Sequence, residues 1–149
     1  MNSPTFRAIE PSDKVAWLEL WAGYLEFYKQ TLSAEQTEIA WNRFFDPDFN
    51  ALGFVVEVDG EVVGLAHCTF HNSTWLPTPD LYLEDLFVAK SYRRLGLGQF
   101  LIESCAEFGK SAGSTRMYWM TQRSNETAQN LYYKIAELSE YIIFKKDFQ

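Results

Sequence analysis

Two adjacent carboxylates, Glu84 and Asp85, stand in the middle of an apolar run that extends from Leu81 to Ala89. Apolar residues occupy both alternation sets of this run, which is typical of a strand covered on both faces. Burying a carboxylate costs free energy unless another group pairs with it. We therefore expect one of the two carboxylates to face a polar cleft, where it could accept a proton.

A glycine-bearing loop, Arg93-Arg94-Leu95-Gly96-Leu97-Gly98, follows this strand and leads into a helical pattern. The apolar residues of that pattern recur at steps of three and four: Phe100, Leu101, Cys105 and Phe108. Glycines allow a ligand to approach the backbone, and the first-turn N–H groups of a helix lack intrahelical partners. The helix dipole and the two arginines add positive charge. The segment therefore predicts a site for a phosphate-bearing ligand.

The loop differs from two common phosphate-binding motifs, because it lacks the Gly-Lys-Ser/Thr of a P-loop and has Leu101 where a dinucleotide fingerprint needs glycine. Its R-x-x-G-x-G pattern, placed directly after YLEDLFV, resembles the pyrophosphate loop of the GNAT superfamily of N-acetyltransferases, which bind acetyl-CoA. A tight turn with glycines for packing alone is the alternative. The resemblance implies loop contacts to the coenzyme from these residues: Arg93, Arg94, Leu95, Gly96, Leu97, Gly98 and Gln99. It also implies backbone contacts from Leu86, Phe87 and Val88.

Acetyl transfer to an amine needs a group that removes a proton, because an amine such as that of lysine, with a pKa of about 10.4, is protonated at neutral pH. The YLEDLFV strand is similar to that of GNAT polyamine and thialysine acetyltransferases, and the match implies that Glu84 is this base. A purely structural carboxylate is the other interpretation. In a regular strand Asp85 would point to the opposite face, where a salt bridge or an ordered loop would account for it. A contact from Asp85 to the acceptor also stays open.

The segment from Asn125 to Tyr132 resembles the N-x-x-A-x-x-L-Y segment of GNAT enzymes. The match implies that Tyr132 is the general acid near the coenzyme sulfur and that Asn125 hydrogen-bonds the coenzyme. A phenol with a pKa of about 10 can protonate a leaving thiolate whose conjugate acid has a pKa of about 8.5. An aromatic side chain that merely packs in the core is the alternative for Tyr132.

An acceptor site is expected where aromatic residues could pack on an alkyl amine and its charge. Trp21, Tyr24 and Tyr28 lie at helical spacing and could line that cleft with Glu84 and Asp85, although such a stripe is also typical of a core. The formal net charge of −7 favours cationic substrates and argues against a nucleic-acid partner. The two histidines, His67 and His71, lack metal-ligand spacing, so we expect no metal site and read both as structural or exposed.

Hydrophobic periodicity and turn signals predict a single domain of residues 1–149. Asp59-Gly60 predicts a hairpin turn, and Ser33 and Asn125 are expected to cap the helices that they begin. The expected strands are Thr5–Ile9, Leu52–Val58, Glu61–Phe70, Leu81–Ala89, Thr115–Thr121 and Tyr141–Phe148. The expected helices run from Asp13 to about Gln30, from Ser33 to about Phe45, through the pattern after Gly98 and from Asn125 onward. The order β-α-α-β-β-β-α-β-α-β is an α/β arrangement, a mixed sheet with helices on both sides. It resembles the GNAT layout over nearly the whole chain.

The last helix departs from the family pattern, because the Gly-Phe that often follows L-Y-x-K-x is replaced by Ala136-Glu137. Only one strand's worth of chain remains, and an incomplete sheet edge invites pairing with another subunit, so we expect a homodimer. The lack of an apolar membrane span and the two isolated cysteines, Cys68 and Cys105, suggest a cytoplasmic protein with buried thiols. A primary amine, polyamine or lysine-like acceptor is expected. A non-catalytic CoA-binding sensor and a peptide N-acetyltransferase are the alternatives.

Overall fold

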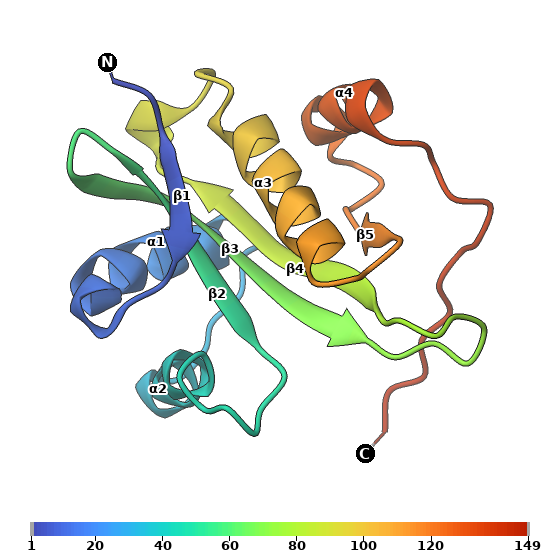
Figure 1. Cartoon of the computed structure of the whole chain (residues 1–149). Helices are drawn as coiled ribbons and strands as arrows, with labels where there is room; N and C mark the ends of the chain where they lie inside the picture. Colours follow the sequence, from blue (N-terminus) through green and yellow to red (C-terminus); the bar gives the residue numbers. More distant parts are fainter. Residues whose placement is uncertain (1, 149) are drawn as a thin grey trace.

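A five-stranded mixed sheet forms the centre of the computed structural model, which describes residues 2–148 (Figure 1). Its strands are β1 (Thr5–Ala8), β2 (Leu52–Val58), β3 (Glu61–His71), β4 (Asp80–Val88) and β5 (Met117–Trp119). They lie in the order β1-β2-β3-β4-β5. The first three pairings are antiparallel and the β4–β5 pairing is parallel, because a helix crosses over between those two strands. The predicted fold class, a mixed α/β sheet, is confirmed.

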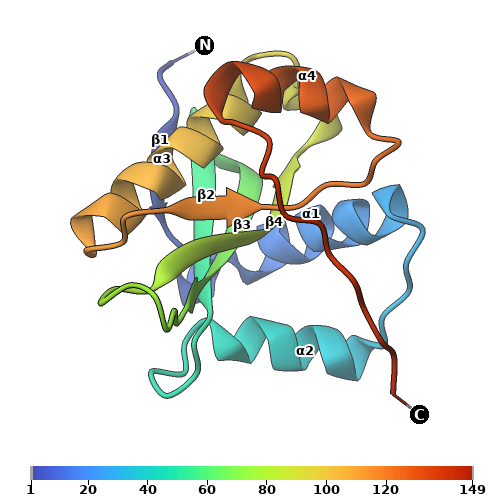
Figure 2. The same cartoon turned by 90° about the vertical axis from the view of Figure 1, so that its right-hand side faces the viewer.

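Helices cover both faces of the sheet, as Figure 2 shows. One face carries α1 (Lys14–Phe27) and α2 (Ala34–Arg43), and the other carries α3 (Leu97–Ser111) and α4 (Glu126–Ile135). Two short 3₁₀ turns, Pro11–Asp13 and Lys90–Tyr92, precede α1 and α3. Each face has its own core. The core under α1 and α2 is built from Ile9, Trp17, Leu20, Trp21, Trp41, Val55 and Leu65. The core under α3 includes Val56, Ala66, Leu81, Leu83, Leu101 and Cys105.

Local sequence signals formed as their chemistry predicts. Asp59 and Gly60 both take positive φ values, 52° and 83°, in the tight turn between β2 and β3. The Ser33 hydroxyl accepts a hydrogen bond from the Gln36 N–H at the start of α2. The Asn125 side chain accepts one from the Ala128 N–H at the start of α4.

Helix α1 ends at Phe27, three residues before the predicted end near Gln30. Lys29 takes a left-handed conformation with φ 54°. Its N–H donates to the Glu26 carbonyl, and the Gln30 N–H donates to the Leu25 carbonyl. This pair of bonds closes the helix and satisfies carbonyls that its last turn would otherwise leave free.

The pairing of β3 with β4 contains a β-bulge at Glu84. His67 lies opposite Asp85, but the next β3 residue, Cys68, lies opposite Leu83, so Glu84 is the extra residue. Leu81 and Leu83 belong to the α3-side core, and beyond the bulge Leu86 and Val88 do so as well. Alternation therefore shifts by one residue, and Glu84 and Asp85 both fall to the α1 side. The expectation that Asp85 points away from Glu84 is wrong, because it assumed a regular strand.

Strands β4 and β5 pair over three positions only, from Leu81–Met117 to Leu83–Trp119. Predicted strand Thr115–Thr121 is correspondingly shorter in the structure. After the bulge, the residues of β4 from Asp85 to Val88 pair with β3 alone among the strands of residues 2–148. The β5 side of this part of β4 is therefore an open edge whose backbone groups can bond a ligand.

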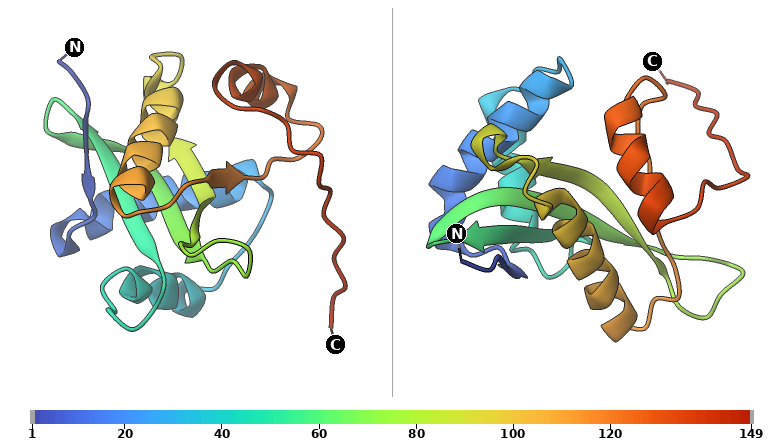
Figure 3. Two further views of the ribbon diagram at one scale, coloured as in Figure 1. Left: turned by 45° about the vertical axis from the view of Figure 1, so that its right-hand side comes forward. Right: turned by 90° about the horizontal axis from the view of Figure 1, so that it is seen from above.

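The predicted last strand, Tyr141–Phe148, is wrong, because this segment is irregular chain in the structure. It leaves α4 and runs along the outside of the molecule without joining the sheet (Figure 3). A strand needs a neighbouring ladder of hydrogen bonds, and the tail finds none within the described chain. Its apolar side chains are exposed, with Phe144 at 87% and Tyr141 at 78%.

No helix within residues 2–148 is both long enough and apolar enough to cross a membrane.

Candidate active site

Asp85 lies at the centre of a hydrogen-bonded network between α1, β3 and β4. The Tyr24 hydroxyl donates to Asp85 Oδ1 over 2.6 Å, and His67 Nδ1 lies 2.9 Å from Asp85 Oδ2. The close approach of α1 to β4 makes the first contact geometrically possible. A Cβ on Gly23 would stand 2.9 Å from the Phe87 ring, so only glycine lets the helix come this near.

Glu84 lies beside this network and is exposed. Partial burial of its carboxyl and the neighbouring negative charge of Asp85 both raise the pKa of Glu84 above its ordinary value. A carboxylate with a raised pKa is a stronger base than an ordinary one. The bulge thus brings the two acidic residues together and changes the proton affinity of one of them.

Trp21 and Tyr24 of α1 and Tyr28 at its C-cap form a row of aromatic rings, and the middle ring, Tyr24, reaches Asp85. The Trp21 and Tyr24 rings are stacked with centroids 5.2 Å apart, and the Tyr24 and Tyr28 rings lie 4.9 Å apart. Trp21 is buried in the core, whereas Tyr24 and Tyr28 are half-buried. The inner end of the predicted stripe is therefore core, and its outer two residues border the site.

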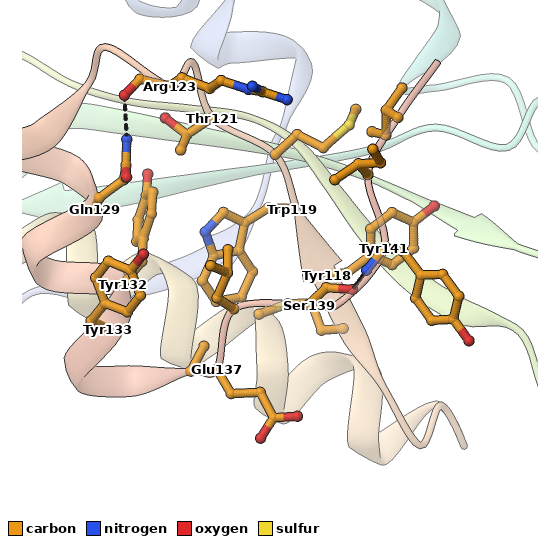
Figure 4. Close-up of a pocket in the computed structure, with 16 residues that line it drawn as sticks. Tyr118, Trp119, Thr121, Arg123, Gln129, Tyr132, Tyr133, Glu137, Ser139 and Tyr141 are labelled. Atoms are coloured by element: carbon orange, nitrogen blue, oxygen red, sulfur yellow. Dashed lines mark hydrogen bonds between the residues drawn. The ribbon is translucent and has the colours of Figure 1, made fainter. Parts of the chain in front are cut away.

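Tyr132 of α4 is the predicted acid, and it is half-buried against Trp119 of β5, with ring centroids 5.4 Å apart (Figure 4). Burial raises the pKa of Tyr132, and the nearby Tyr28 phenol acts in the same direction. Tyr28 in turn feels the charge of Asp85. The phenol of Tyr132 is protonated at neutral pH and so holds a proton that it can donate.

A pocket of about 450 Å³ lies beside Tyr132. Residues of β5, α4 and the tail line it, and Figure 4 shows Trp119, Tyr132 and Tyr141 around it. The Glu84–Asp85 pair does not line it. The pocket occupies the place beside β5 where a further strand would pair.

The start of α3 is open in the manner that a phosphate group requires. Gly96 is the N-cap, with φ 77°, and no side chain of residues 2–148 caps the helix. Its first-turn N–H groups therefore remain available. A Cβ placed on Gly96 or Gly98 would meet no described atom within 4 Å, so both glycines face open space. Arg94 also takes a positive φ of 64°, a strained conformation for a side chain-bearing residue. This loop fits the pyrophosphate of a coenzyme.

Arg93 folds back on the open edge of β4. Its Nε donates to the Val88 carbonyl over 3.1 Å, and its guanidinium lies 5.1 Å from the centre of the Phe87 ring. Leu86, Phe87 and Val88 thus connect the acidic pair to the phosphate loop along one strand. Leu95 lies within that loop, and Gln99 lies in the first turn of α3. The Asn125 side-chain oxygen accepts the capping hydrogen bond of α4, and its amide N–H groups remain free to donate to a ligand.

Two residues of the network were not among the predicted site residues. His67 was expected to be structural or exposed, and it is buried against Asp85. Trp17 of α1 donates to the same ring and has no exposed surface. The only signal for His67 was a polar ring in an apolar strand, and its partner depends on a non-local strand register.

Comparisons with known proteins agree with this geometry. The acetyltransferase (GNAT) family model matches residues 15–136. A D-amino-acid N-acetyltransferase of Saccharomyces cerevisiae is 34% identical over 144 residues, covering 95% of this chain and 89% of the relative. A thialysine N-ε-acetyltransferase of Caenorhabditis elegans is 31% identical over 80 residues, covering 54% of this chain and 49% of the relative.

Solved structures show the same fold. A ribosomal-protein-alanine N-acetyltransferase from Brucella melitensis biovar Abortus 2308 has a TM-score of 0.81 at 18% identity, with 99% of this chain and all of that chain covered (100%). AAC(6′)-Iy, in complex with the bisubstrate analogue CoA-S-monomethyl-acetylneamine, has a TM-score of 0.80 at 20% identity, with 99% of this chain and 100% of that chain covered. The glycine loop, the open edge of β4 and the family match together lead to one conclusion: this chain belongs to the GNAT family of acetyltransferases.

Proposed function

We propose that this acetyl-CoA-dependent N-acetyltransferase transfers the acetyl group to a cationic primary amine, namely a small amine, a polyamine or a lysine-like group. One observation carries the acceptor class. Asp85 is only 16% exposed, yet no Lys or Arg side chain of residues 2–148 pairs with it. Tyr24 and His67 bond its oxygens but supply no fixed positive charge, and an acceptor ammonium group would supply that charge.

The shape and composition of the site support a small amine. The half-buried rings of Tyr24 and Tyr28 border the acidic pair and can pack on an alkyl chain. The net charge of −7 favours the approach of cations. The relatives named above act on D-amino acids and on thialysine, which are small amines.

The proposed mechanism is direct attack in a ternary complex. Bound acetyl-CoA supplies the acetyl thioester. Glu84 accepts a proton from the acceptor ammonium, directly or through water, so that the neutral nitrogen can attack. Tyr132 donates its phenolic proton to the departing sulfur. The coenzyme would be held by the Arg93–Gln99 loop and by backbone groups of residues 86–88. Both cysteines are buried and free within residues 2–148, which leaves no exposed thiol for an acetyl-enzyme route.

The test is thiol release from acetyl-CoA with a panel of D-amino acids, diamines, polyamines, thialysine, aminoglycosides and basic peptides. Glu84→Gln should lower kcat by about 10²- to 10⁴-fold, the usual contribution of a general base. Tyr132→Phe should lower kcat by about 10²-fold on the same grounds. Calorimetric CoA affinity should stay within about threefold of wild type in Glu84→Gln.

Tyr133→Phe is the matched control, because Tyr133 is the neighbouring phenol on α4 and is 60% exposed. Turnover of basic peptides but of no small amine would show that the acceptor is a peptide. CoA binding without turnover of any amine would contradict the proposed acceptor class. Undiminished turnover in Glu84→Gln would remove Glu84 from the base role.

We also propose a homodimer in the cytoplasm. The exposed apolar tail, with Ile142 at 65% and Ile143 at 67%, and the unpaired outer edge of β5 support the dimer. The two reduced, buried cysteines fit a reducing compartment.

A further inference from the structure

We propose that His67 is a positioning residue for Asp85, and that the indole of Trp17 selects the ring tautomer that allows this. The three side chains form a chain of hydrogen bonds that leads from the buried core of α1 to the acidic pair on β4. The role rests on the proposed function, because the value of a fixed Asp85 lies in binding the acceptor ammonium.

The tautomer follows from the chemistry of tryptophan. The Trp17 Nε1–H lies 3.0 Å from His67 Nε2. An indole nitrogen is a donor only, so Nε2 must accept and cannot carry a hydrogen. The neutral imidazole then has its hydrogen on Nδ1. Because Trp17 has no exposed surface, water cannot replace the ring nitrogen as its acceptor.

The Nδ1–H group is left facing Asp85. It donates to Asp85 Oδ2 over 2.9 Å, while the Tyr24 hydroxyl donates to Oδ1 over 2.6 Å. Each carboxylate oxygen therefore receives one hydrogen bond from a neutral group, and the two bonds together fix the orientation of the carboxylate. A carboxylate has about four acceptor positions, so positions for an ammonium group remain.

The surroundings of His67 keep the ring in place. Phe44, Trp21 and Trp17 pack around it, with ring centroids 4.5, 5.4 and 6.0 Å away. Its side chain is 7% exposed. Rotation of the ring would bring an unprotonated nitrogen or a carbon against Asp85 and leave the indole N–H without an acceptor, which is costly in a buried site.

Two substitutions of His67 test its two hydrogen bonds separately. His67→Asn places an amide N–H near the Nδ1 position and keeps the donor to Asp85, but it loses the acceptor for Trp17. His67→Gln keeps an oxygen near the Nε2 position for Trp17, but it loses the donor to Asp85. Both replace a ring with a smaller amide, so damage to packing is similar in the two variants.

The expected result is a difference in acceptor KM. Loss of a hydrogen bond to a charged group corresponds to about a tenfold change or more. His67→Gln should raise the KM for the best amine about tenfold relative to His67→Asn, with the same CoA affinity in both. A purely structural His67 would give equal KM values in the two variants, and that outcome would overturn the inference.

The tautomer can be observed without any acceptor. The chain has two histidines, so ¹⁵N spectra of histidine-labelled protein give two rings, and His71→Gln assigns them. Wild type should show the Nδ1–H form of His67, and Trp17→Phe should allow the Nε2–H form as well. An Nε2–H form in wild type would refute the inference. Absence of turnover on every amine would refute the proposed function alone, because these spectra do not depend on it.

Discussion

At the scale of single residues, Glu84 and Asp85 have different environments, which suit the two roles that we propose for them. Asp85 is held by Tyr24 and His67 and carries no hydrogen-bonded cation among residues 2–148. Glu84 is exposed and has no such donors within the described chain, and burial and the charge of Asp85 raise its pKa. Adjacent carboxylates with unlike surroundings are a means of obtaining one anion and one base.

The pH dependence tests this division. Burial and the charge of Asp85 raise the pKa of Glu84, and the base acts only when ionised, so kcat should rise with pH through this pKa. Asp85→Asn removes the like charge and lowers the pKa of Glu84. The rising limb of the kcat profile, measured with saturating acceptor, should therefore move to lower pH. Asp48→Asn, on an exposed turn before β2, is the control and should leave the limb in place. An unmoved limb in Asp85→Asn would assign it to another group.

At the scale of elements, the bulge in β4 and the uncapped start of α3 together leave backbone groups free to bond a ligand. The bulge ends the pairing of β4 with β5 and leaves an open edge, which runs toward the glycine loop. Arg93 connects the two through the Val88 carbonyl. A long, narrow coenzyme such as acetyl-CoA can then be bonded along one strand and at one helix terminus.

Substitutions at two glycines of this loop distinguish an effect on fold stability from an effect on CoA affinity. Gly98 has an ordinary helical conformation and faces open space, so Gly98→Ala should stabilise the fold by roughly 0.5–1 kcal/mol. The new methyl group would occupy the space of the coenzyme, and CoA affinity should fall at least about tenfold. Gly96→Ala, at φ 77°, should instead destabilise the fold by about 1 kcal/mol. Thermal denaturation and calorimetry measure both. Unchanged CoA affinity in Gly98→Ala would place the coenzyme elsewhere.

At the scale of the whole molecule, the tail contributes no side chain to either core of the described chain. Residues 141–148 expose several large apolar side chains, and no neighbouring strand of residues 2–148 pairs with them. A second copy of the chain presents the same tail and the same β5 edge. Twofold pairing of these elements would cover both surfaces at once.

Oligomeric state tests the homodimer. Light scattering at micromolar concentration should give twice the 17.3 kDa mass of one chain. Phe144→Asp should shift the protein to monomer, because Phe144 is 87% exposed in one chain and its charge would enter the proposed interface. Val15→Asp is the matched control, since Val15 is 74% exposed on α1. A wild-type monomer would refute the dimer.

Local interactions explain what could be predicted from the sequence. The Asp59-Gly60 turn, the Ser33 and Asn125 caps and the glycine loop depend on residues a few positions apart, and each formed where its chemistry indicated. The order of elements follows from periodicity, apart from the last strand. The family resemblance then connected Glu84, Tyr132 and the loop to acetyl transfer.

The amino-acid sequence by itself therefore determined the fold class, the position of the glycine loop before α3 and the kind of reaction. Tertiary structure alone decided which face Asp85 occupies, because that depends on one extra residue in the register between β3 and β4. It also decided that Trp17, His67 and Tyr24 meet at Asp85, through contacts between residues up to 61 positions apart. The tail remained irregular because β pairing needs a partner, and within one chain no strand reaches it.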